Sequence, residues 1–464
     1  MLEWYRGLPP RSANDSGGTP SGSRGGALGR RSLLSVISAM LLAAPAAHAT
    51  SFRTVYVFSG GNDGGYPESP LITDANGNLY GLANAGGVRG GGVVYRLRPA
   101  SGTAHGYSQT TLYAFCILSN CTDGQRPIGA LVLRSGALYG ATVSGGVFGG
   151  GAVFKLTPPT EQGQPWTETV LHGFATESSA ADGYNPNGGL VFDQAGNLFG
   201  TTNAGGTAGA KSSGAIFELT HSGVYTILYS FPTDSRLGVG LNWGLTLDEA
   251  GNLYGITQQG GSPECADFGA GCGSVFELSP PGPGKTAWIF TTLYDFHKNK
   301  SGHNGFWPYG GVIRRGGALY GTTENGGIRG NFGTVYKLSP PKSGAGFWNE
   351  TIIEDFFRHG DGWSDEPLAG VVFDSAGNLF GTTNGPGKDS SDNGTLYRLS
   401  RPASGKAGWS EAPLALFTSL LPTGIYPRSL MINAAGSVYG VTYAGGDTNA
   451  NGGYGFGTVF QLLP

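Results

Sequence analysis

An aromatic residue followed by glycine recurs along this chain at nearly constant intervals, and this repeat limits the possible folds more than any other feature. Each copy lies in a phrase such as "DQAGNLFGTTNAGG" (193–206). The seven copies, spaced 55 to 66 residues apart, are Tyr80-Gly81, Tyr139-Gly140, Phe199-Gly200, Tyr254-Gly255, Tyr320-Gly321, Phe380-Gly381 and Tyr439-Gly440. A period of this length indicates an array of similar structural units.

Three further motifs accompany each aromatic-glycine pair in a fixed order. One precedes it ("GLVFD", "GVVFD"), one follows it ("GAVFKL", "GTVYKL"), and the last ends in phenylalanine ("TVLHGF", "TIIEDF"). All are short, rich in β-branched or aromatic residues, and bounded by Gly, Pro, Asn or Asp, as β-strands are. Four strands in a unit of about 59 residues predict a propeller blade, because solenoid units are usually shorter.

The motifs at the two ends of the array predict how the ring closes. The first strand, 53–58, is of the phenylalanine-ending type that completes a unit, whereas the last motif, 457–462, is of the type before it. An open array would leave unpaired strand edges, which proteins avoid. We therefore predict an all-β, seven-bladed β-propeller over 52–464 with four-stranded blades, closed by the N-terminal strand 53–58 completing the C-terminal blade.

The phrase "DxxGN" is expected to form the turn between the first and second strands of a blade. Asp binds the turn backbone, and Gly accepts a positive φ before the chain returns. The copy "DANGN" (74–78) resembles part of a calcium loop. The other copies lack its middle ligand and no Glu closes it, so a hairpin turn is favoured over calcium.

An aromatic residue stands eight positions before the phenylalanine that ends most units: Tyr107, Trp166, Trp288, Trp348 and Trp409. Even spacing predicts that Trp166, Val170 and Phe174 lie on one face of their strand. Packing between neighbouring outer strands is favoured over a binding role for these tryptophans.

The first 49 residues differ in composition from the rest. Residues 1–29 are rich in Gly, Ser, Pro and Arg and are expected to be a disordered extension, or the product of a wrongly assigned start. Residues 30–49 have two arginines, an apolar run and a small-x-small sequence ending at Ala49, which predict a signal peptide. We expect an extracellular or periplasmic product without a membrane span; an uncleaved anchor and a twin-arginine route are the alternatives.

The four cysteines form two close pairs in predicted loops: Cys116 with Cys121, and Cys265 with Cys272. In an oxidising compartment each pair would form a local disulfide. Zinc is disfavoured because neither pair has Cys-x-x-Cys spacing or a neighbouring histidine.

The charge of the chain excludes a nucleic-acid partner. Its 28 basic and 31 acidic residues give a net charge of −3, whereas a nucleic-acid binder needs a clustered basic face. The segment "GPGKT" (282–286) is not a P-loop, because Ser279 stands where the first glycine is required. We expect no cofactor and a monomer.

Aromatic residues accompany the prolines of the loops that join one unit to the next. The candidate ligand-binding residues are Tyr66, Tyr184, Trp243, Trp307, Trp363 and Tyr426. Aromatic faces bury a large area at low entropic cost and would serve as platforms for sugars or peptides. The alternative is that they cover the loop prolines. The predicted function is a non-catalytic binding or scaffold module for a carbohydrate or an extracellular protein.

The most polar of these loops, 358–367, suggests a second function. His359, Asp361, Asp365 and Glu366 could supply an acid/base pair or hold a metal. The alternative is therefore a secreted propeller enzyme, a lyase or hydrolase; a solvated loop with no chemistry fits the same residues.

Several phrases together resemble a known repeat family. They are "GNLFGTTNAGG" (196–206), "GAVFKL" (151–156) and "WTETVLHGF" (166–174). They are similar to the GloVer (Gloeo_Verruco) tandem-repeat family of exported bacterial proteins, and the resemblance covers essentially all of 52–464. It implies an exported repeat protein and no particular activity.

Overall fold

The structure is a computed structural model. It describes residues 51–464 apart from 104, 162, 177–180, 208–211, 233–237, 239, 264, 266–270, 298–303, 329, 343, 345, 358–365, 386–391, 403–407, 419–422 and 448. The predicted extension 1–29 and signal peptide 30–49 lie outside the described residues. Among the described residues, no helix has the length and apolar character needed to cross a membrane.

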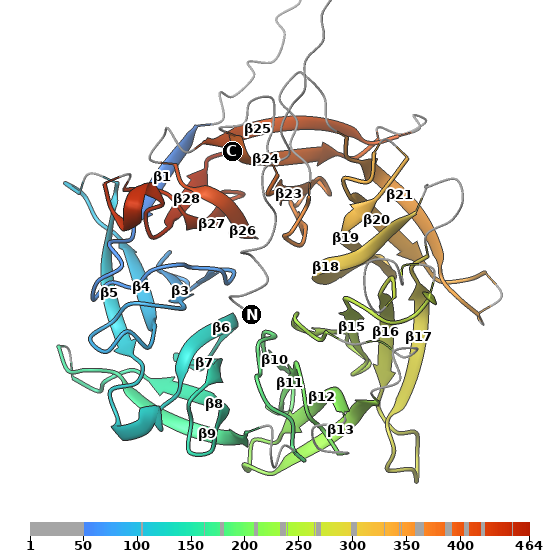
Figure 1. Cartoon of the computed structure of the whole chain (residues 1–464), viewed down its shortest axis with the longest axis horizontal. Coiled ribbons are helices and arrows are strands. Elements are labelled where there is room, and N and C mark those ends of the chain that lie inside the picture. The colour runs from blue at the N-terminus through green and yellow to red at the C-terminus, as the bar shows by residue number, and fades with distance from the viewer. Residues whose placement is uncertain are drawn as a thin grey trace, which may run out of the picture. The chain divides into compact units, whose positions relative to one another are not determined.

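Seven antiparallel sheets, each of four strands, stand around a common axis as the blades of a propeller (Figure 1). Blade 1 contains β2 (Ile72–Thr73), β3 (Leu79–Ala83), β4 (Val93–Pro99) and β5 (Tyr107–Ala114). Blade 2 contains β6 (Gln125–Arg134), β7 (Ala137–Ser144), β8 (Gly149–Thr157) and β9 (Thr167–Ala175). Blade 3 contains β10 (Val191–Phe192), β11 (Leu198–Thr202), β12 (Ser212–Leu219) and β13 (Tyr225–Pro232).

The remaining blades repeat this arrangement. Blade 4 contains β14 (Thr246–Leu247), β15 (Leu253–Thr257), β16 (Ser274–Ser279) and β17 (Ile289–Asp295). Blade 5 contains β18 (Gly305–Arg315), β19 (Ala318–Gly326), β20 (Thr334–Ser339) and β21 (Asn349–Asp355). Blade 6 contains β22 (Val372–Phe373), β23 (Leu379–Thr383), β24 (Asp392–Ser400) and β25 (Ser410–Thr418). Blade 7 contains β26 (Ile425–Ile432), β27 (Val438–Ala444), β28 (Thr458–Leu462) and, as its outer strand, β1 (Phe52–Val57). Short 3₁₀ helices occupy Ser119–Cys121 and Asn451–Gly453.

The closing blade confirms the predicted ring. Strand β1 pairs antiparallel with β28, with Arg53 opposite Gln461. The Arg53 Nε donates to the Gln461 side-chain oxygen at 2.9 Å, and the backbone N–H of Phe58 donates to Gly457 at 3.0 Å. The two ends of the described chain are therefore held in one sheet.

The hydrophobic core lies between the blades. Seven clusters of buried side chains each join residues of two neighbouring blades, and one of them joins Val459 of blade 7 to Tyr95 of blade 1. The phenylalanine that ends each outer motif is 0–3% exposed in all seven blades: Phe58, Phe115, Phe174, Phe231, Phe296, Phe356 and Phe417. A single blade therefore cannot bury its own apolar faces and depends on both neighbours.

The repeated aromatic-glycine pair is explained by a close approach within each blade. In blade 5, Gly321 lies directly opposite Tyr336 in the ladder, and a Cβ at Gly321 would lie 2.6 Å from the Cζ atom of that tyrosine. The aromatic ring of the third strand thus crosses over the glycine of the second. The same relation joins glycine and aromatic in every blade: Gly81 and Tyr95, Gly140 and Phe154, Gly200 and Phe217, Gly255 and Phe276, Gly381 and Tyr397, and Gly440 and Phe460.

The outer strands correct one expectation. Trp166 and Phe174 do not share a face: Trp166 packs against the cluster between blades 1 and 2, whereas Phe174 belongs to the cluster between blades 2 and 3. The reason is a β-bulge at Leu171, where the ladder passes from Val170 to His172. One extra residue reverses the alternation of side chains. All seven outer strands carry such a bulge three residues before their phenylalanine: Val55, Leu112, Leu171, Leu228, Leu293, Ile353 and Leu414.

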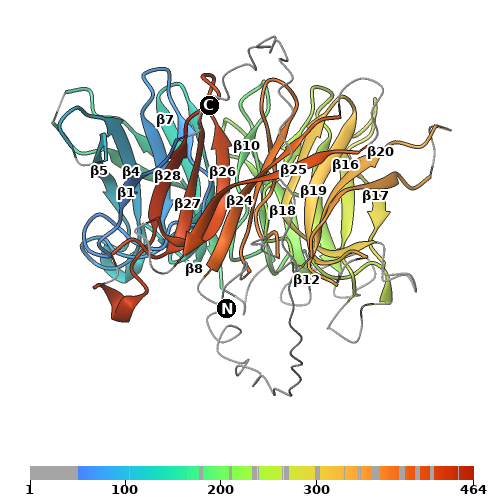
Figure 2. The same cartoon turned by 90° about the horizontal axis from the view of Figure 1, so that it is seen from above.

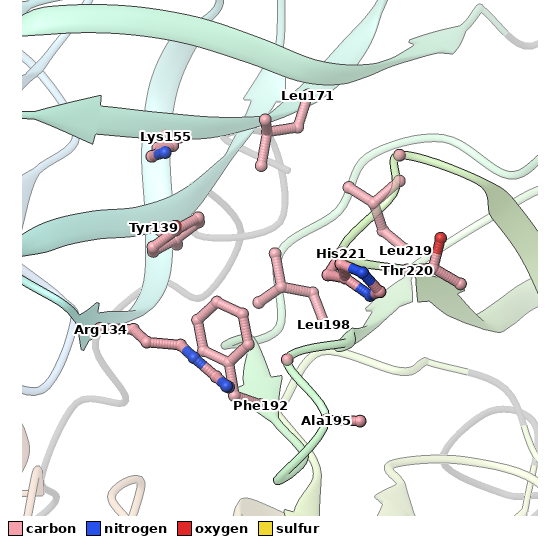
Figure 3. A pocket seen from close by; sticks show the side chains of 12 residues that line it. Arg134, Tyr139, Lys155, Leu171, Phe192, Ala195, Leu198, Leu219, Thr220 and His221 are labelled. Atoms are coloured by element: carbon pink, nitrogen blue, oxygen red, sulfur yellow. The ribbon is translucent and has the colours of Figure 1, made fainter.

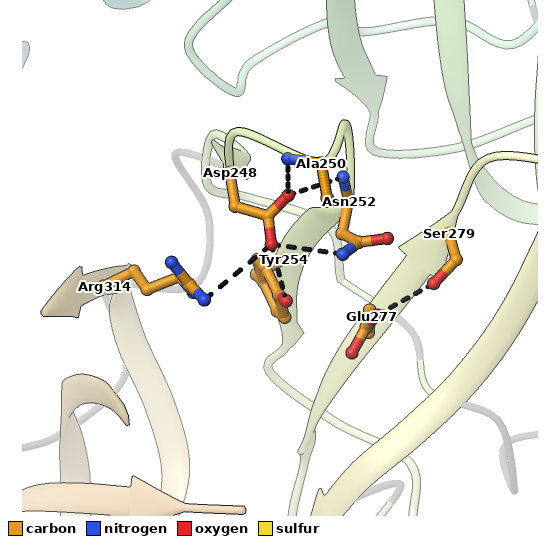
Figure 4. Close-up of polar contacts among 7 residues, drawn as sticks. All are labelled: Asp248, Ala250, Asn252, Tyr254, Glu277, Ser279 and Arg314. Atoms are coloured by element: carbon orange, nitrogen blue, oxygen red, sulfur yellow. Dashed lines mark hydrogen bonds and ion pairs between the residues drawn. The ribbon is translucent and has the colours of Figure 1, made fainter. Parts of the chain in front are cut away.

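The "DxxGN" phrase forms the predicted turn (Figure 4). Asp248 Oδ1 accepts from the backbone N–H of Ala250 at 3.0 Å and of Asn252 at 2.9 Å, while Oδ2 accepts from the Asn252 amide and the Tyr254 hydroxyl. Burial acts to raise the pKa of Asp248, but these hydrogen bonds outweigh it and hold the pKa below its usual value. Both oxygens of Asp74 accept hydrogen bonds within its turn in the same way, so the turn accounts for "DANGN" without calcium.

Removal of β1 should destabilise the whole ring. We expect a chain that begins at residue 59 to melt at a clearly lower temperature than one that begins at residue 50, because it loses a sheet edge and two buried side chains of the blade 7–blade 1 cluster. The milder substitution Phe58→Ala should cost about 3–5 kcal/mol. Thermal melting followed by circular dichroism measures both. Unchanged melting of either variant would contradict closure by β1.

A methyl group on the glycine of the repeat should also destabilise the fold. We expect Gly321→Ala to cost about 1–3 kcal/mol, because the Tyr336 ring has to move. Gly282 is a matched control, since nothing lies within 4 Å of a Cβ at that position. Urea unfolding compares the two variants. Equal stability of Gly321→Ala and Gly282→Ala would show that the close approach does not select glycine.

Candidate functional site

Antiparallel pairing places two kinds of connection on one end of the ring. The segments from the second to the third strand, and from the fourth strand to the next blade, emerge together on what we call the loop face (Figure 2). Hydrogen bonds join the two kinds: Gly65 exchanges backbone hydrogen bonds with Ala85. The remaining turns, including those of "DxxGN", lie at the opposite end.

The prolines of the loop face join neighbouring blades. Six of the seven loops carry a residue with φ between 54° and 62° immediately before proline: Tyr66, Arg126, Asn185, Trp307, Glu366 and Tyr426. The backbone N–H of this residue reaches the preceding blade, as in Trp307 to Cys272 O (2.8 Å) and Arg126 to Gly91 O (2.7 Å). A left-handed residue before proline is unusual, so the inter-blade hydrogen bond and the packing around it must hold it there.

The proline itself packs against a glycine of the preceding blade. A Cβ at Gly333, at the start of the third-strand motif of blade 5, would lie 2.6 Å from Cδ of Pro367 in blade 6. Blade 4 has no proline at this position and places Gly240 and Leu241 there instead. These contacts are part of the scaffold and do not themselves form a site.

The aromatic residues predicted to bind a ligand occupy different positions in their loops. Tyr66, Trp307 and Tyr426 precede prolines, Tyr184 lies two residues before one, and Trp243 lies three residues before β14, the innermost strand of blade 4. Trp307 donates its indole N–H to Gly271 O at 3.1 Å. Tyr66 packs against Tyr443 and Trp243 against Tyr309, with ring centroids 5.1 and 4.5 Å apart. Trp363 lies outside the described residues.

Of the four residues of the enzymatic alternative, the structure describes one. His359, Asp361 and Asp365 lie outside the described residues. Glu366 is exposed; its backbone N–H donates to Phe332 at 3.0 Å, and its carbonyl accepts from Asn384 at 3.0 Å. Its charge acts on Glu324, which belongs to the cluster described next.

The repeats differ in residue type at two rows of positions close to the ring axis. The first row follows the loop proline, or Leu241 in blade 4, and the second lies three residues after the glycine of the aromatic-glycine pair. The first row reads Glu68, Ile128, Asn187, Asn242, Tyr309, Leu368 and Arg428, and the second Asn84, Val143, Asn203, Gln258, Glu324, Asn384 and Tyr443. Backbone bonds such as Gln258 N–H to Gly240 O (3.3 Å) hold the rows together.

Amide side chains of blades 3 and 4 form a hydrogen-bonded network across these rows. Asn242 Oδ1 accepts from Asn187 Nδ2 at 2.9 Å and from Asn203 Nδ2, while Asn242 Nδ2 donates to Gln258 Oε1 at 3.1 Å. Gln258 in turn hydrogen-bonds Glu324. We call the polar residues Glu68, Asn187, Asn203, Asn242, Gln258, Glu324 and Arg428 the axial cluster.

The charged groups of the axial cluster act on one another. Burial raises the pKa of Glu324 to about 7; the charge of Glu366 adds to the rise, and the Gln258 bond and Arg428 oppose it. Burial also raises the pKa of Glu68, opposed by Arg428 and Arg126. Arg428 therefore acts electrostatically on both carboxyl groups, and its guanidinium is 5.5 Å from the centre of the Tyr443 ring.

Two amide oxygens in these rows have no hydrogen-bond donor among the described residues. They are Oδ1 of Asn187, a residue that is 8% exposed, and Oδ1 of Asn384. Buried polar atoms without a partner are rare and call for an explanation. Amides, a carboxyl group of raised pKa and a guanidinium can bind hydroxyl groups and anions. The described residues contain no group of three or more His, Cys, Asp or Glu that could hold a metal.

The sequence did not lead to a prediction of the axial cluster, because aromatic residues and charged loops served as the signs of a site. A usable signal exists: the position after the loop proline varies in residue type from blade to blade, while the proline and the flanking glycines repeat.

A hollow on the opposite end of the ring lies between blades 2 and 3 (Figure 3). It is lined by Arg134, Tyr139, Lys155, Phe192 and His221, among others. The Arg134 guanidinium lies 4.7 Å from the centre of the Phe192 ring and donates to Asp193 O at 2.9 Å. Arg315 makes the same contacts with Phe373 and Asp374 between blades 5 and 6. This recurrence indicates a structural brace between blades.

Both predicted disulfides are present, and the described residues include no free cysteine. Both bonds lie on the loop face. Cys265 and Cys272 are fully buried, and Cys272 O accepts the hydrogen bond from Trp307. Two disulfides agree with folding in an oxidising compartment.

Solved structures similar to this chain are propellers of low sequence identity. They include the extracellular domain of a proposed hybrid two-component system from B. thetaiotaomicron (11% identity, TM-score 0.49). The match covers 88% of this chain and 39% of the B. thetaiotaomicron chain. A gluconolactonase from Xanthomonas campestris has 13% identity and a TM-score of 0.38 over 92% of this chain and 93% of that one. A calcium-containing carbohydrate-active enzyme of Trichoderma reesei has 13% identity and a TM-score of 0.41 over 90% and 96%. Likeness at this level says nothing about a ligand or an activity.

No curated protein matches this chain in sequence. One repeat family does, over residues 43–207 and 164–352, which together span more than half of the chain. This chain belongs to the Gloeobacter/Verrucomicrobia repeat family.

Proposed function

We propose that this chain is an exported, non-catalytic binding module whose ligand, a hydroxyl-rich carbohydrate, binds at the axial cluster. The observation that carries the proposal is the amide network at the axis, with the Asn187 oxygen buried and unpartnered beside it. A carbohydrate hydroxyl would donate to that oxygen and relieve the cost of burying it.

The residue types of the axial cluster fit sugars better than other small ligands. Side-chain amides both donate and accept, as vicinal hydroxyl groups do. The Trp243–Tyr309 pair lies beside the network, because Tyr309 is in the same row as Asn242, and supplies aromatic surface. Binding sites are commonly built by combining a few such polar groups with apolar or aromatic walls. An extracellular protein remains the second class of ligand that these side chains would suit.

Export is part of the same proposal. The two disulfides support it, together with the sequence pattern that predicts cleavage near Ala49. Such a module would act outside the cytoplasm, where it would meet glycan ligands.

One observation favours the enzymatic alternative enough to keep it as a second candidate. A carboxyl group with a pKa of about 7 is suited to general acid/base catalysis, and the charge of Glu366, a residue of loop 358–367, contributes to that value in Glu324. Binding without catalysis is preferred because the hydrogen-bond partner identified for Glu324 is the Gln258 amide, which has no role in proton transfer.

A glycan array distinguishes these proposals. We expect the full chain to bind at least one glycan class, and Asn187→Ala and Asn242→Ala to weaken binding about tenfold or more, since each removes a hydrogen bond and leaves buried partners unpaired. Asn76→Ala is the matched control, because Asn76 is an exposed residue of a turn at the opposite end. Absence of binding to any glycan would contradict the carbohydrate proposal; release of product that requires Glu324 would establish the enzyme.

The raised pKa of Glu324 predicts how stability depends on pH. The folded-state pKa of about 7 exceeds the ordinary value of 4.5, so the folded state disfavours the ionised carboxylate. The stability contributed by this group is full below about pH 4.5 and is lost as pH rises to about 7. Between pH 5 and pH 8 the melting temperature of the parent chain should fall, and we expect that of Glu324→Gln to fall by less. The exposed Glu249→Gln serves as control, and parallel curves for all three proteins would refute the assignment.

A further inference from the structure

The loop face carries a patch of exposed apolar side chains away from the ring axis, over blades 1 and 2. Its members are Val88, Ile117, Leu118, Val147 and Phe148, each between 45% and 70% exposed, and we call it the apolar rim. They come from three loops, 86–92, 116–124 and 145–151. Exposed apolar groups that gather in this way mark interaction surfaces in soluble proteins.

The three loops touch one another. The backbone N–H of Gly146 donates to Cys121 O at 2.9 Å, and a Cβ at Gly91 would lie 2.6 Å from the Cβ of Cys116. The middle loop, closed by the Cys116–Cys121 disulfide, therefore lies between the other two. All three loops connect strands at the same end of the closed ring, the end opposite the "DxxGN" turns.

The loops 86–92 and 145–151 form hydrogen bonds between their own backbone groups. In the first, Gly90 N–H donates to Gly87 O at 3.1 Å and Gly92 N–H to Gly86 O at 2.9 Å. In the second, Gly149 N–H donates to Gly146 O at 3.2 Å and Gly151 N–H to Gly145 O at 2.9 Å. Val88 and Arg89 stand at the corner of one turn, and Val147 and Phe148 at the corner of the other. A tip whose backbone is internally bonded enters an apolar medium at lower cost.

The exposed charged residue of the three loops is basic. It is Arg89, on loop 86–92; Arg126 is exposed just after loop 116–124, where its charge acts on Glu68. The only acidic residue in the three loops is Asp123, which is fully buried; its carboxylate accepts from the Tyr113 hydroxyl and from the backbone N–H groups of Ile117 and Leu118 at 3.0 to 3.3 Å. The three loops, all of which the structure describes, therefore combine apolar tips with an exposed arginine and carry no exposed carboxylate.

We propose that the apolar rim is a peripheral membrane-docking surface that inserts Val147, Phe148 and Val88 into the headgroup region of an anionic bilayer. Aliphatic and phenyl groups are favoured there, and arginines are attracted by lipid phosphates. A protein partner is the less favoured occupant, because the rim offers few of the hydrogen-bonding side chains that surround a protein interface. This docking does not depend on the ligand proposed for the axial cluster.

The test is flotation of the full chain with lipid vesicles. We expect binding to vesicles of phosphatidylethanolamine and phosphatidylglycerol in a 3:1 ratio, weaker binding in high salt, and little binding to pure phosphatidylcholine, as interfacial charge attraction requires. The pair Val147→Ser and Phe148→Ser should reduce partitioning about tenfold or more, and Arg89→Gln about fivefold. Melting temperatures should not change, because these side chains are exposed.

A tryptophan reporter locates the contact. Phe148→Trp should shift its emission to the blue on vesicles and be quenched by brominated lipid, whereas Phe347→Trp, equally exposed in a turn at the opposite end, should show neither effect. Equal quenching of both, unchanged flotation of the rim variants, or equal binding to neutral vesicles would overturn the proposal. So would failure to bind any vesicle together with rim-dependent capture of one protein, which would identify a protein interface instead.

Discussion

Packing between blades is the constraint on which the rest of this structure depends. Every blade is a thin four-stranded sheet with an apolar layer on both faces, and the seven buried clusters each draw on two blades. The glycine of the aromatic-glycine pair lets the third-strand aromatic ring lie flat on the sheet, as Tyr336 lies over Gly321. With a larger residue in place of this glycine, the aromatic ring would stand away from the sheet and push the neighbouring blade away. Closure by β1 supplies the last of these interfaces and leaves blade 7 with a complete sheet.

The sequence was sufficient to predict the number of blades, the closure and the turns, because each of these depends on a local pattern repeated many times. It was insufficient for the outer strands, where the bulge at Leu171 and its equivalents reverses the face of every residue before it. A bulge adds one residue without changing composition, so even spacing between Trp166 and Phe174 gave the wrong face. The signal that it leaves is an apolar residue always three positions before the phenylalanine, which is visible only once the register is known.

The candidate site was missed for a related physical reason. Loop aromatics such as Tyr66 and Trp307 draw attention as ligand platforms, but their backbone N–H groups join neighbouring blades by hydrogen bonds, and the prolines that follow them pack against the preceding blade. The axial cluster is formed by residues far apart in sequence, and Asn187, Asn242 and Gln258 meet only because neighbouring blades stand side by side around the axis. No single stretch of sequence contains enough of this cluster to reveal it, whereas the variation from copy to copy at one position does.

The repetition of this chain separates what holds the ring from what is free to vary. Positions that must fit a neighbouring blade are restricted in every copy, since a change there affects two interfaces. Positions that face the axis or the tips of the loop face are less restricted, and Asn242 and Phe148 differ from their counterparts in other blades. Both the axial cluster and the apolar rim consist of residues of this second kind. The two surfaces lie on the same face of the ring, so a chain docked through the rim would hold its axial cluster close to the surface it binds.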